Sequence, residues 1–263
     1  MTTEIYEGEH LLRGKTVFLS ASKPSRSPDR FPASDEVELE EGVRCLARAV
    51  FAEGGHLVFG AHPSISPLIV DVATEYFPPD WQAGSRKERP VSIYQSKAFR
   101  DVIPAATRDL ESLGYARIEM TDAVNGETAV FPPPPHEQCQ SSLAHMRQRM
   151  FTETSPVAMV AAGGMEGVIR EAKLFLETCQ GNVYFLAKSG GACEKMLLYL
   201  ESGIAPDVQP VFIPNWRPRV IAIEDRFGEP HWGAYRGEHA YLPDQPYALL
   251  MQKVVRHIAG KVE

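Results

Sequence analysis

The sequence predicts an α/β fold, a three-layer α/β/α sandwich built on a mostly parallel sheet. Short apolar runs alternate along the 263 residues with segments whose apolar residues recur at helical spacing. Most of these runs are apolar throughout, which is typical of strands buried on both faces. Glycine or proline stands at many of the boundaries between the two kinds of segment. Such alternation calls for right-handed crossovers, with helices covering both faces of the sheet.

Each expected strand is a short apolar run bounded by polar, glycine or proline residues. The first follows Arg13-Gly14-Lys15, and the run that follows Pro156 is the most core-like in the chain. The four prolines after Phe131 exclude a central strand at that point. The expected strands are Thr16–Ser20, His56–Gly60, Val91–Tyr94, Ala116–Met120, Val157–Ala162, Asn182–Leu186 and Val220–Ile223.

The expected helices begin and end at recognisable signals. Asp35, with Glu38 three residues later, has the pattern of a capping box, and Val37 opens the apolar face of this helix. Pro67 suits a first helical turn, and Gly54-Gly55 is a natural stop. We expect one domain, residues 1–263, whose terminal helix at about 246–261 packs on the core. The expected helices span 34–53, 67–77, Asp101–Leu113, Glu137–Thr152, Glu166–Thr178, 191–200 and Tyr247–Ala259.

Composition excludes several classes of protein. The net charge of −7 disfavours a general nucleic-acid binder and docking on an anionic membrane. No apolar run is long enough for a transmembrane helix, and the acidic N-terminus is unlike a signal peptide. The four cysteines are widely spaced and form no CxxC pair, which indicates reduced thiols in a cytoplasmic protein.

Four loops that follow expected strands carry the candidate ligand-binding residues, because ligands of open parallel sheets bind beyond the carboxyl ends of the strands. The first offers hydroxyls and cations that suit a phosphate: Ser20, Ser22, Lys23 and Arg26. The second offers Gly60, His62 and Ser64 before a helix start. An ordinary solvated loop is the alternative for the first, and a helix cap made by Ser64 or Ser66 for the second.

The third loop is the strongest candidate, because an apolar strand runs into a glycine turn and then a helix. This arrangement aims backbone N–H groups and the positive end of the helix at an anion. It places Gly163, Gly164, Met165 and Gly167 at the turn, with Glu171 one helical turn further on. The fourth loop contributes Gly190. A tight turn without a ligand is the alternative for both loops.

Several familiar motifs are absent. There is no GxGxxG motif with an acidic residue at the dinucleotide spacing, no P-loop and no GxSxG elbow. No HExxH motif or Cys/His spacing supports a metal. We therefore expect no cofactor and no metal.

The segment from His145 to Glu171 resembles the SLOG superfamily. In it, His145-Met146-Arg147-Gln148-Arg149-Met150 precedes an apolar strand, and Gly163-Gly164-Met165-Glu166-Gly167-Val168-Ile169-Arg170-Glu171 follows it. That superfamily includes cytokinin-activating LOG phosphoribohydrolases, lysine-decarboxylase-like proteins, DNA-uptake factors and sensor domains of bacterial anti-phage and nucleotide-signalling systems. The resemblance covers roughly residues 15–200 and implies a Rossmann-like fold.

The resemblance also implies roles for individual residues. LOG enzymes carry a catalytic arginine on the helix before the strand and a PGGxGTxxE motif after it. Gly163, Gly164 and Gly167 match the phosphate-binding glycines, and Glu171 matches the catalytic acid. Arg147 matches the catalytic arginine, with Arg149 as the alternative because one extra residue precedes Gly167. Ala162 stands where the LOG motif has its proline, and Val168 where it has its threonine. The missing threonine hydroxyl removes one expected phosphate donor, which favours sensing of the ligand over its cleavage.

Three functions follow as hypotheses. The first is binding, or sensing, of a nucleotide-derived ligand such as an ADP-ribose-type molecule or a nucleoside monophosphate. The second is hydrolysis of a nucleotide N-glycosidic bond, in which Glu171 stabilises positive charge on the ribose. The third is an oligomerising scaffold with a vestigial pocket. The expected partners are a small nucleotide-derived ligand and further copies of the chain, with no nucleic acid and no membrane. Lys23, Arg26, Arg147 and Arg149 are expected to concentrate positive charge around the phosphate.

Overall fold

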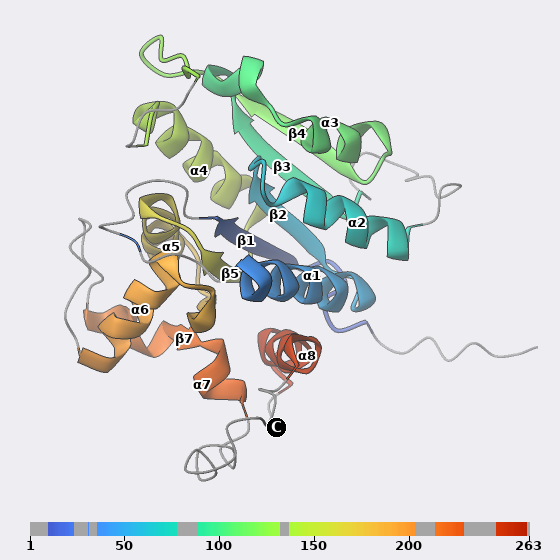
Figure 1. Cartoon of the computed structure of the whole chain (residues 1–263), viewed down its shortest axis with the longest axis vertical. Helices are drawn as coiled ribbons and strands as arrows, with labels where there is room; N and C mark the ends of the chain where they lie inside the picture. Colours follow the sequence, from blue (N-terminus) through green and yellow to red (C-terminus); the bar gives the residue numbers. More distant parts are fainter. Residues whose placement is uncertain are drawn as a thin grey trace, which may run out of the picture.

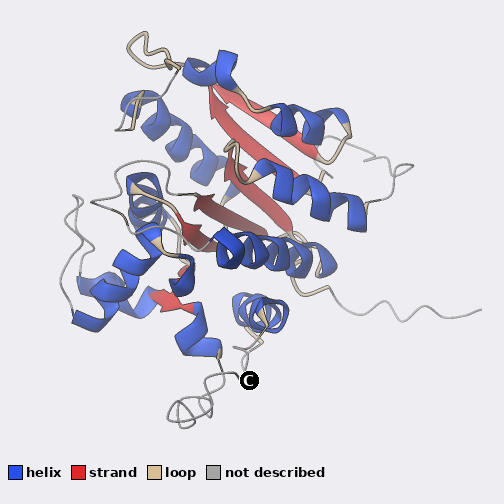
Figure 2. Cartoon of the chain, in the orientation of Figure 1, coloured by secondary structure: helices blue, strands red, loops and turns tan. Residues whose placement is uncertain are grey.

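In the computed structural model, the described residues are 10–23, 31, 36–77, 89–131, 137–202, 214–228 and 246–261. They form one seven-stranded, all-parallel sheet with the order β4-β3-β2-β1-β5-β6-β7. Helices lie on both sides of this sheet (Figures 1 and 2). The predicted α/β/α sandwich with a parallel sheet is confirmed.

The elements follow the predicted alternation closely. The strands are β1 (Thr16–Ser22), β2 (His56–Gly60), β3 (Val91–Ser96), β4 (Ala116–Thr121), β5 (Ala158–Gly163), β6 (Asn182–Leu186) and β7 (Val220–Ala222). The α-helices are α1 (Glu36–Ala52), α2 (Ser66–Tyr76), α3 (Ala105–Ser112), α4 (Gln140–Thr154), α5 (Glu166–Thr178), α6 (Gly191–Ser202), α7 (Ile223–Phe227) and α8 (Tyr247–Ile258). Three 3₁₀ helices are η2 (Lys97–Val102), η3 (Ala187–Ser189) and η4 (Pro214–Arg219).

Alternate strand residues build two separate cores, one on each face of the sheet. Leu19 and Phe59 share a cluster with buried residues of α1, α2, α3 and α8. Phe18 and Val58, their neighbours in sequence, share the other cluster with buried residues of α4, α5 and α6. The terminal helix α8 buries Leu250, Met251, Val254 and Val255 in the first of these cores. The switch in strand order at β1, between β2 and β5, sets the place where a ligand site is expected.

Three sequence predictions need correction, and one helix was missed. Val37 is exposed, so it does not belong to the apolar face of α1. The helix expected over Asp101–Leu113 is broken into η2 and α3, because the residue before Pro104 adopts an extended conformation. Glu137 precedes α4, which begins only after Cys139 in a left-handed conformation. The short helix α7 was not predicted. The capping box at Ser34-Asp35 lies outside the described residues.

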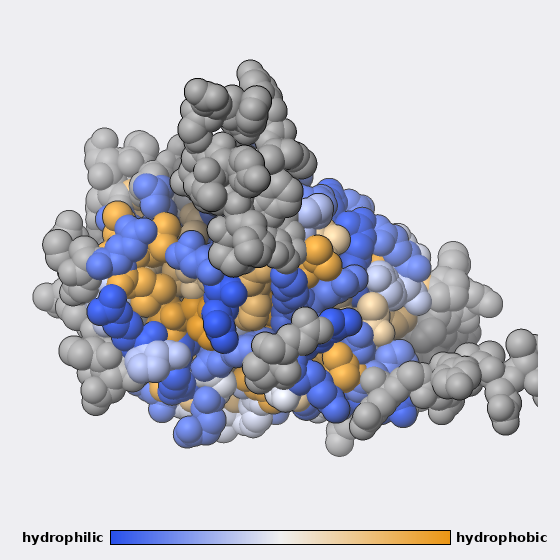
Figure 3. All heavy atoms as spheres, turned by 90° about the horizontal axis from the view of Figure 1, so that it is seen from below, coloured by the Kyte–Doolittle hydropathy of each residue, from blue (hydrophilic) through white to orange (hydrophobic). Residues whose placement is uncertain are grey.

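None of the helices among the described residues is long and apolar enough to cross a membrane. Seen from below the view of Figure 1, hydrophilic and hydrophobic residues are interspersed (Figure 3).

All four cysteines are free thiols, and Cys45 and Cys193 are buried. Burial raises the pKa of both buried thiols to about 12, so neither is a thiolate near neutral pH.

Candidate functional site

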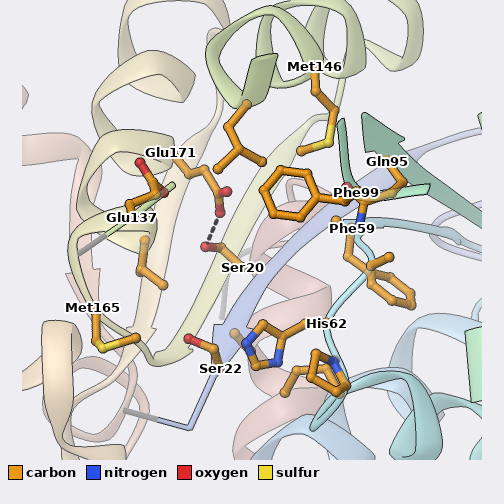
Figure 4. A pocket seen from close by; sticks show the side chains of 18 of the residues that line it. Ser20, Ser22, Phe59, His62, Gln95, Phe99, Glu137, Met146, Met165 and Glu171 are labelled. Carbon is orange, nitrogen blue, oxygen red and sulfur yellow. Dashed lines mark hydrogen bonds between the residues drawn. The ribbon is translucent and has the colours of Figure 1, made fainter. Parts of the chain in front are cut away.

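A cavity of about 390 Å³ lies at the carboxyl ends of β1, β2 and β3, beside the first turn of α5 and one side of α4 (Figure 4). It lies where the order of the strands reverses, the position at which open α/β sheets bind ligands. Eight predicted site residues line it: Ser20, Ser22, Gly60, His62, Arg147, Met165, Gly167 and Glu171. The other described ones, Lys23, Ser64, Arg149, Gly163, Gly164 and Gly190, do not line it, and Arg26 lies outside the described residues.

A buried charge network forms one wall of the cavity. The Nε of Arg147 donates to Oε1 of Glu171 at 2.9 Å, and its Nη2 donates to Oε1 of Glu137 at 2.8 Å. Arg170 donates to the second oxygen of Glu137. Ser20 Oγ donates to Oε2 of Glu171 at 2.5 Å, which joins the network to β1. Glu171 is therefore in direct contact with Arg147, one of the two arginines that the motif left as alternatives.

Within this network, the opposite charges change the pKa values of Arg147 and Glu137 more than burial does. Arg147 is only 6% exposed, and burial alone would lower its pKa, but the charges of Glu171 and Glu137 raise that pKa above its ordinary value. Burial likewise raises the pKa of Glu137, yet Arg147 and Arg170 lower it by more, so its net pKa lies below 4.5. Glu137 is consequently a carboxylate near neutral pH.

Glu137 should make the stability of the fold sensitive to acid. A carboxyl whose pKa is lowered by folding stabilises the native state above its unfolded pKa, and this contribution is lost as the pH falls through the folded pKa. We expect the loss to begin near the ordinary value of 4.5 and to continue below it. Acid unfolding followed by circular dichroism should therefore be shallower for Glu137→Gln than for the unmodified protein. Identical pH profiles would contradict the assigned ion pairs.

The glycine pair shapes the site without offering its own N–H groups. Gly164 N–H donates to Ser22 O at 2.7 Å, and Gly163 N–H donates to Ser189 Oγ at 2.7 Å. Both glycines have positive φ, and a Cβ on Gly163 would lie 2.7 Å from Ser22 O. The pair thus allows β1 and β5 to approach closely. Because both N–H groups already have acceptors within the protein, they are not available in this conformation for the phosphate binding that the motif implies.

Alanine at Gly163 should destabilise the fold strongly. The substitution combines a left-handed backbone with a clash against backbone and Leu39, whereas Gly126 has a positive φ with nothing within 4 Å. We expect Gly163→Ala to lower the free energy of unfolding by at least about 1 kcal/mol more than Gly126→Ala does. Denaturant titration of the two variants measures this difference, and equal losses would show that the close approach at Gly163 is unimportant.

The first turn of α5 lies along the cavity, which is lined there by Met165, Glu166, Gly167 and Val168. Met165 is the N-cap residue and makes no side-chain capping bond, and the first N–H groups of a helix have no intrahelical acceptor. A Cβ on Gly167 would lie 3.2 Å from Arg147 Nη2 and 3.3 Å from Glu137 Oε1. The charge network therefore packs directly on this turn, whose positive dipole end favours nearby anions.

The loop after β2 brings a second set of polar groups to the cavity. His62 lines it, and His62 Nδ1 lies 2.8 Å from Ser64 Oγ. The Lys23 N–H donates to the same hydroxyl at 3.4 Å, which ties this loop to the end of β1. Neither predicted helix cap forms, because Ile65 is the N-cap residue of α2 and Ser66 Oγ bonds to Thr107 at 2.8 Å. Ser64 therefore positions His62 rather than capping the helix.

The predicted concentration of positive charge does not form among the described residues. Lys23 lies 2.9 Å from Glu36 and 2.7 Å from Glu40, so it is paired with α1. Arg149 is 2.6 Å from Glu153 on the outer side of α4. Arg147, the third described cation of the predicted set, is shared between Glu137 and Glu171. Within the described part of the chain, an anion in this cavity would therefore meet hydroxyls and the paired Arg147 rather than an unpaired lysine or arginine.

The fourth loop supports the glycine turn from behind. Ser189 Oγ accepts from Gly163 and donates to Leu186 O at 2.6 Å. Gly190 has a φ of 70°, which only a glycine adopts readily, and leads into α6. The partly buried carboxylate of Glu224 accepts from the N–H groups of Ala187 and Lys188. The role of this loop is therefore to support the turn at Gly163 and Gly164.

Sequence reasoning missed the opposite, apolar end of the cavity and one of its acids. Phe59, Phe99, Leu143 and Met146 line that end, together with the exposed Val130 and Phe131. Gln95 lies among them at the end of β3. Glu137 was assigned to a helix, and no local pattern indicated that it contacts Arg147. These residues come from elements that are distant in sequence, so only the folded chain brings them together.

A comparison with protein-family models decides the classification. The model of the SLOG cluster3 family matches residues 30–209, which is more than half of the chain. The chain belongs to this family. In this SLOG protein, the match includes α4, the glycine turn and α5, whereas β1 with Ser20 and Ser22 precedes it. No curated protein matches the sequence. SLOG membership suggests nucleotide-related binding or processing.

Proposed function

We propose that this SLOG protein binds a small nucleotide-derived ligand, either an ADP-ribose-type molecule or a nucleoside monophosphate, in the cavity at the strand ends. One observation carries the proposal: the cavity joins the first turn of α5, where Met165 makes no side-chain capping bond, to a compartment lined by aromatic and other apolar side chains. Phosphate suits the first end and a nucleobase suits the second.

Ser22 is the hydroxyl donor available at the phosphate end of the cavity. It lines the cavity next to the first turn of α5, whose N-cap residue is Met165, whereas the hydroxyl of Ser20 already donates to Glu171. Arg147 is already shared by two carboxylates, so it contributes less attraction than an unpaired arginine would. The bound phosphate is therefore expected next to Ser22 and Gly167, held mainly by N–H and hydroxyl donors.

A thermal-shift screen tests the proposal. A ligand that binds only the native state raises its stability in proportion to RT ln(1 + [L]/Kd). We expect AMP, UMP or ADP-ribose at millimolar concentration to raise the midpoint of unfolding, and unphosphorylated adenosine to raise it less. If no phosphorylated nucleotide shifts the midpoint, the proposal is wrong.

Hydrolysis of an N-glycosidic bond is the second candidate, and the contact between Arg147 and Glu171 favours it. Glu171 is held by both Ser20 and Arg147 and faces the cavity (Figure 4). A carboxylate fixed in this way can stabilise positive charge that develops on a ribose as the bond to the base breaks. Glu137, the second carboxylate of the wall, provides another ionised group beside Arg147.

A further inference from the structure

The Gln95 side chain is a buried amide at the apolar end of the cavity. It is 6% exposed and lines the cavity from the end of β3. Its Oε1 accepts the backbone N–H of Ser96 at 2.9 Å. A backbone N–H can only donate, so the oxygen of the amide must face Ser96 and the orientation of the side chain is fixed by chemistry. The amide nitrogen Nε2 therefore points away from Ser96.

The Nε2 group of Gln95 carries two hydrogens and, within the part of the chain that is described, has no hydrogen-bond partner. The side chain as a whole is buried, but Nε2 is not among the fully buried atoms that lack a partner, so this donor reaches the open space of the cavity, where a ligand or water can accept it. The charge network on the other wall does not use Gln95, since Arg147 is satisfied by Glu137 and Glu171. Gln95 is thus available to a ligand.

The surroundings of Gln95 suit a flat ring. Phe59 of β2, Phe99 of η2 and Met146 of α4 line the same end of the cavity. Figure 4 shows Gln95 beside Phe99, on the opposite side of the view from Glu137 and Glu171. Aromatic rings and a thioether pack well against the face of a heterocycle, while a single amide can recognise its edge.

We propose that Gln95 is the residue that recognises the base: Nε2 donates to a ring nitrogen on the edge of an adenine held among Phe59, Phe99 and Met146. The inference rests on the proposed function, whose ADP-ribose-type ligand carries adenine, and deepens it by assigning the residue that contacts the base. Adenine offers acceptors only at N1, N3 and N7, so the donor selects one of these three atoms. A carbonyl or ring nitrogen satisfies the amide, whereas an amino group would oppose it with a second donor.

Calorimetric titration with AMP and its 1-deaza, 3-deaza and 7-deaza analogues tests this assignment. In each analogue a C–H group replaces one ring nitrogen, so the chosen hydrogen bond is lost without a change of shape. We expect one of the three analogues to bind the unmodified protein about tenfold more weakly than AMP, since tenfold corresponds to about 1.4 kcal/mol. Gln95→Met should bind AMP about tenfold more weakly and should no longer distinguish that analogue from AMP.

Two further variants separate recognition from a structural role. Gln95→Glu keeps the acceptor for Ser96 but turns an oxygen toward the base, so it should weaken AMP binding at least as much as Gln95→Met does. Gln148→Met is the matched control, because Gln148 lies exposed on α4 and does not line the cavity. This control should distinguish the analogues as the unmodified protein does.

Each outcome of the titration has a separate meaning. If no nucleotide binds, the proposed function fails. If UMP or CMP binds and AMP does not, the function stands and adenine recognition is overturned. If AMP binds but all three analogues bind equally well, or if Gln95→Met discriminates as the unmodified protein does, the role of Gln95 is overturned. Unfolding of the variants without ligand shows whether each is folded.

Discussion

Replacing Arg147 with methionine is expected to lower the free energy of unfolding by about 3–5 kcal/mol, because removal of one partner of a buried ion pair leaves the other charge without compensation. Here two carboxylates, Glu137 and Glu171, lose their shared partner. Methionine retains much of the length of the side chain, so the decrease in the free energy of unfolding reflects the lost charge more than lost packing. Urea titration followed by fluorescence measures the change.

Arg149→Met is the matched control for this change. Arg149 lies two residues away on the same helix, but its side chain is 39% exposed and pairs with Glu153. Surface substitutions of this kind usually change stability by less than about 0.5 kcal/mol. Equal losses for the two arginines would contradict the placement of Arg147 in the buried network. The pair of variants also distinguishes the two arginines that the sequence left as alternatives.

Replacing Glu171 with glutamine is expected to abolish most of any N-glycosidic activity. If the protein releases free base from a nucleoside monophosphate, loss of the carboxylate charge should slow that release by about 10²–10³-fold, the magnitude found when one preorganised electrostatic group is removed. Glutamine keeps an acceptor for Ser20 or Arg147, so the fold should be retained. Chromatographic detection of free base over time provides the rate.

Glu177→Gln serves as the control for this experiment, because Glu177 lies at the far end of α5 and interacts with Lys173 at the surface. It should leave the rate unchanged. A Glu171→Gln variant that releases base at the full rate would exclude Glu171 from catalysis. If the unmodified protein binds nucleotides but releases no base, the protein is a binding protein and the second candidate function is wrong.

The secondary structure could be predicted well wherever local patterns decide it. Glu166–Thr178 and Asn182–Leu186 were predicted with the observed bounds, because a turn with glycine or a polar residue flanks a regular apolar pattern at each. The break at Pro104 was missed, although the conformation of a residue before proline is restricted. The exposure of Val37 was missed because the first turn of a helix can project beyond the sheet that the helix covers.

The site was only partly predictable, for a physical reason. Glu171 could be found because a glycine turn and a helix position it relative to β5, and Arg147 because the segment resembles the LOG motif, which left Arg149 as the alternative. The pairing of Lys23 with Glu36 and Glu40 depends on how the loop after β1 lies against α1. The contact of Glu137 with Arg147 depends on the path of the chain before α4. Such contacts arise from tertiary packing, which periodicity and motif spacing do not encode.

The most direct test of the account is a calorimetric comparison of AMP with adenosine on the unmodified protein and on Ser22→Asp. Ser22 lines the cavity next to the first turn of α5, so an aspartate there would place a negative charge where the phosphate is expected. We expect AMP to bind at least about tenfold more tightly than adenosine, Ser22→Asp to remove that advantage, and Ser22→Ala, which loses one hydroxyl donor but adds no charge, to reduce it less. Equal affinities for AMP and adenosine, or full AMP binding by Ser22→Asp, would contradict it.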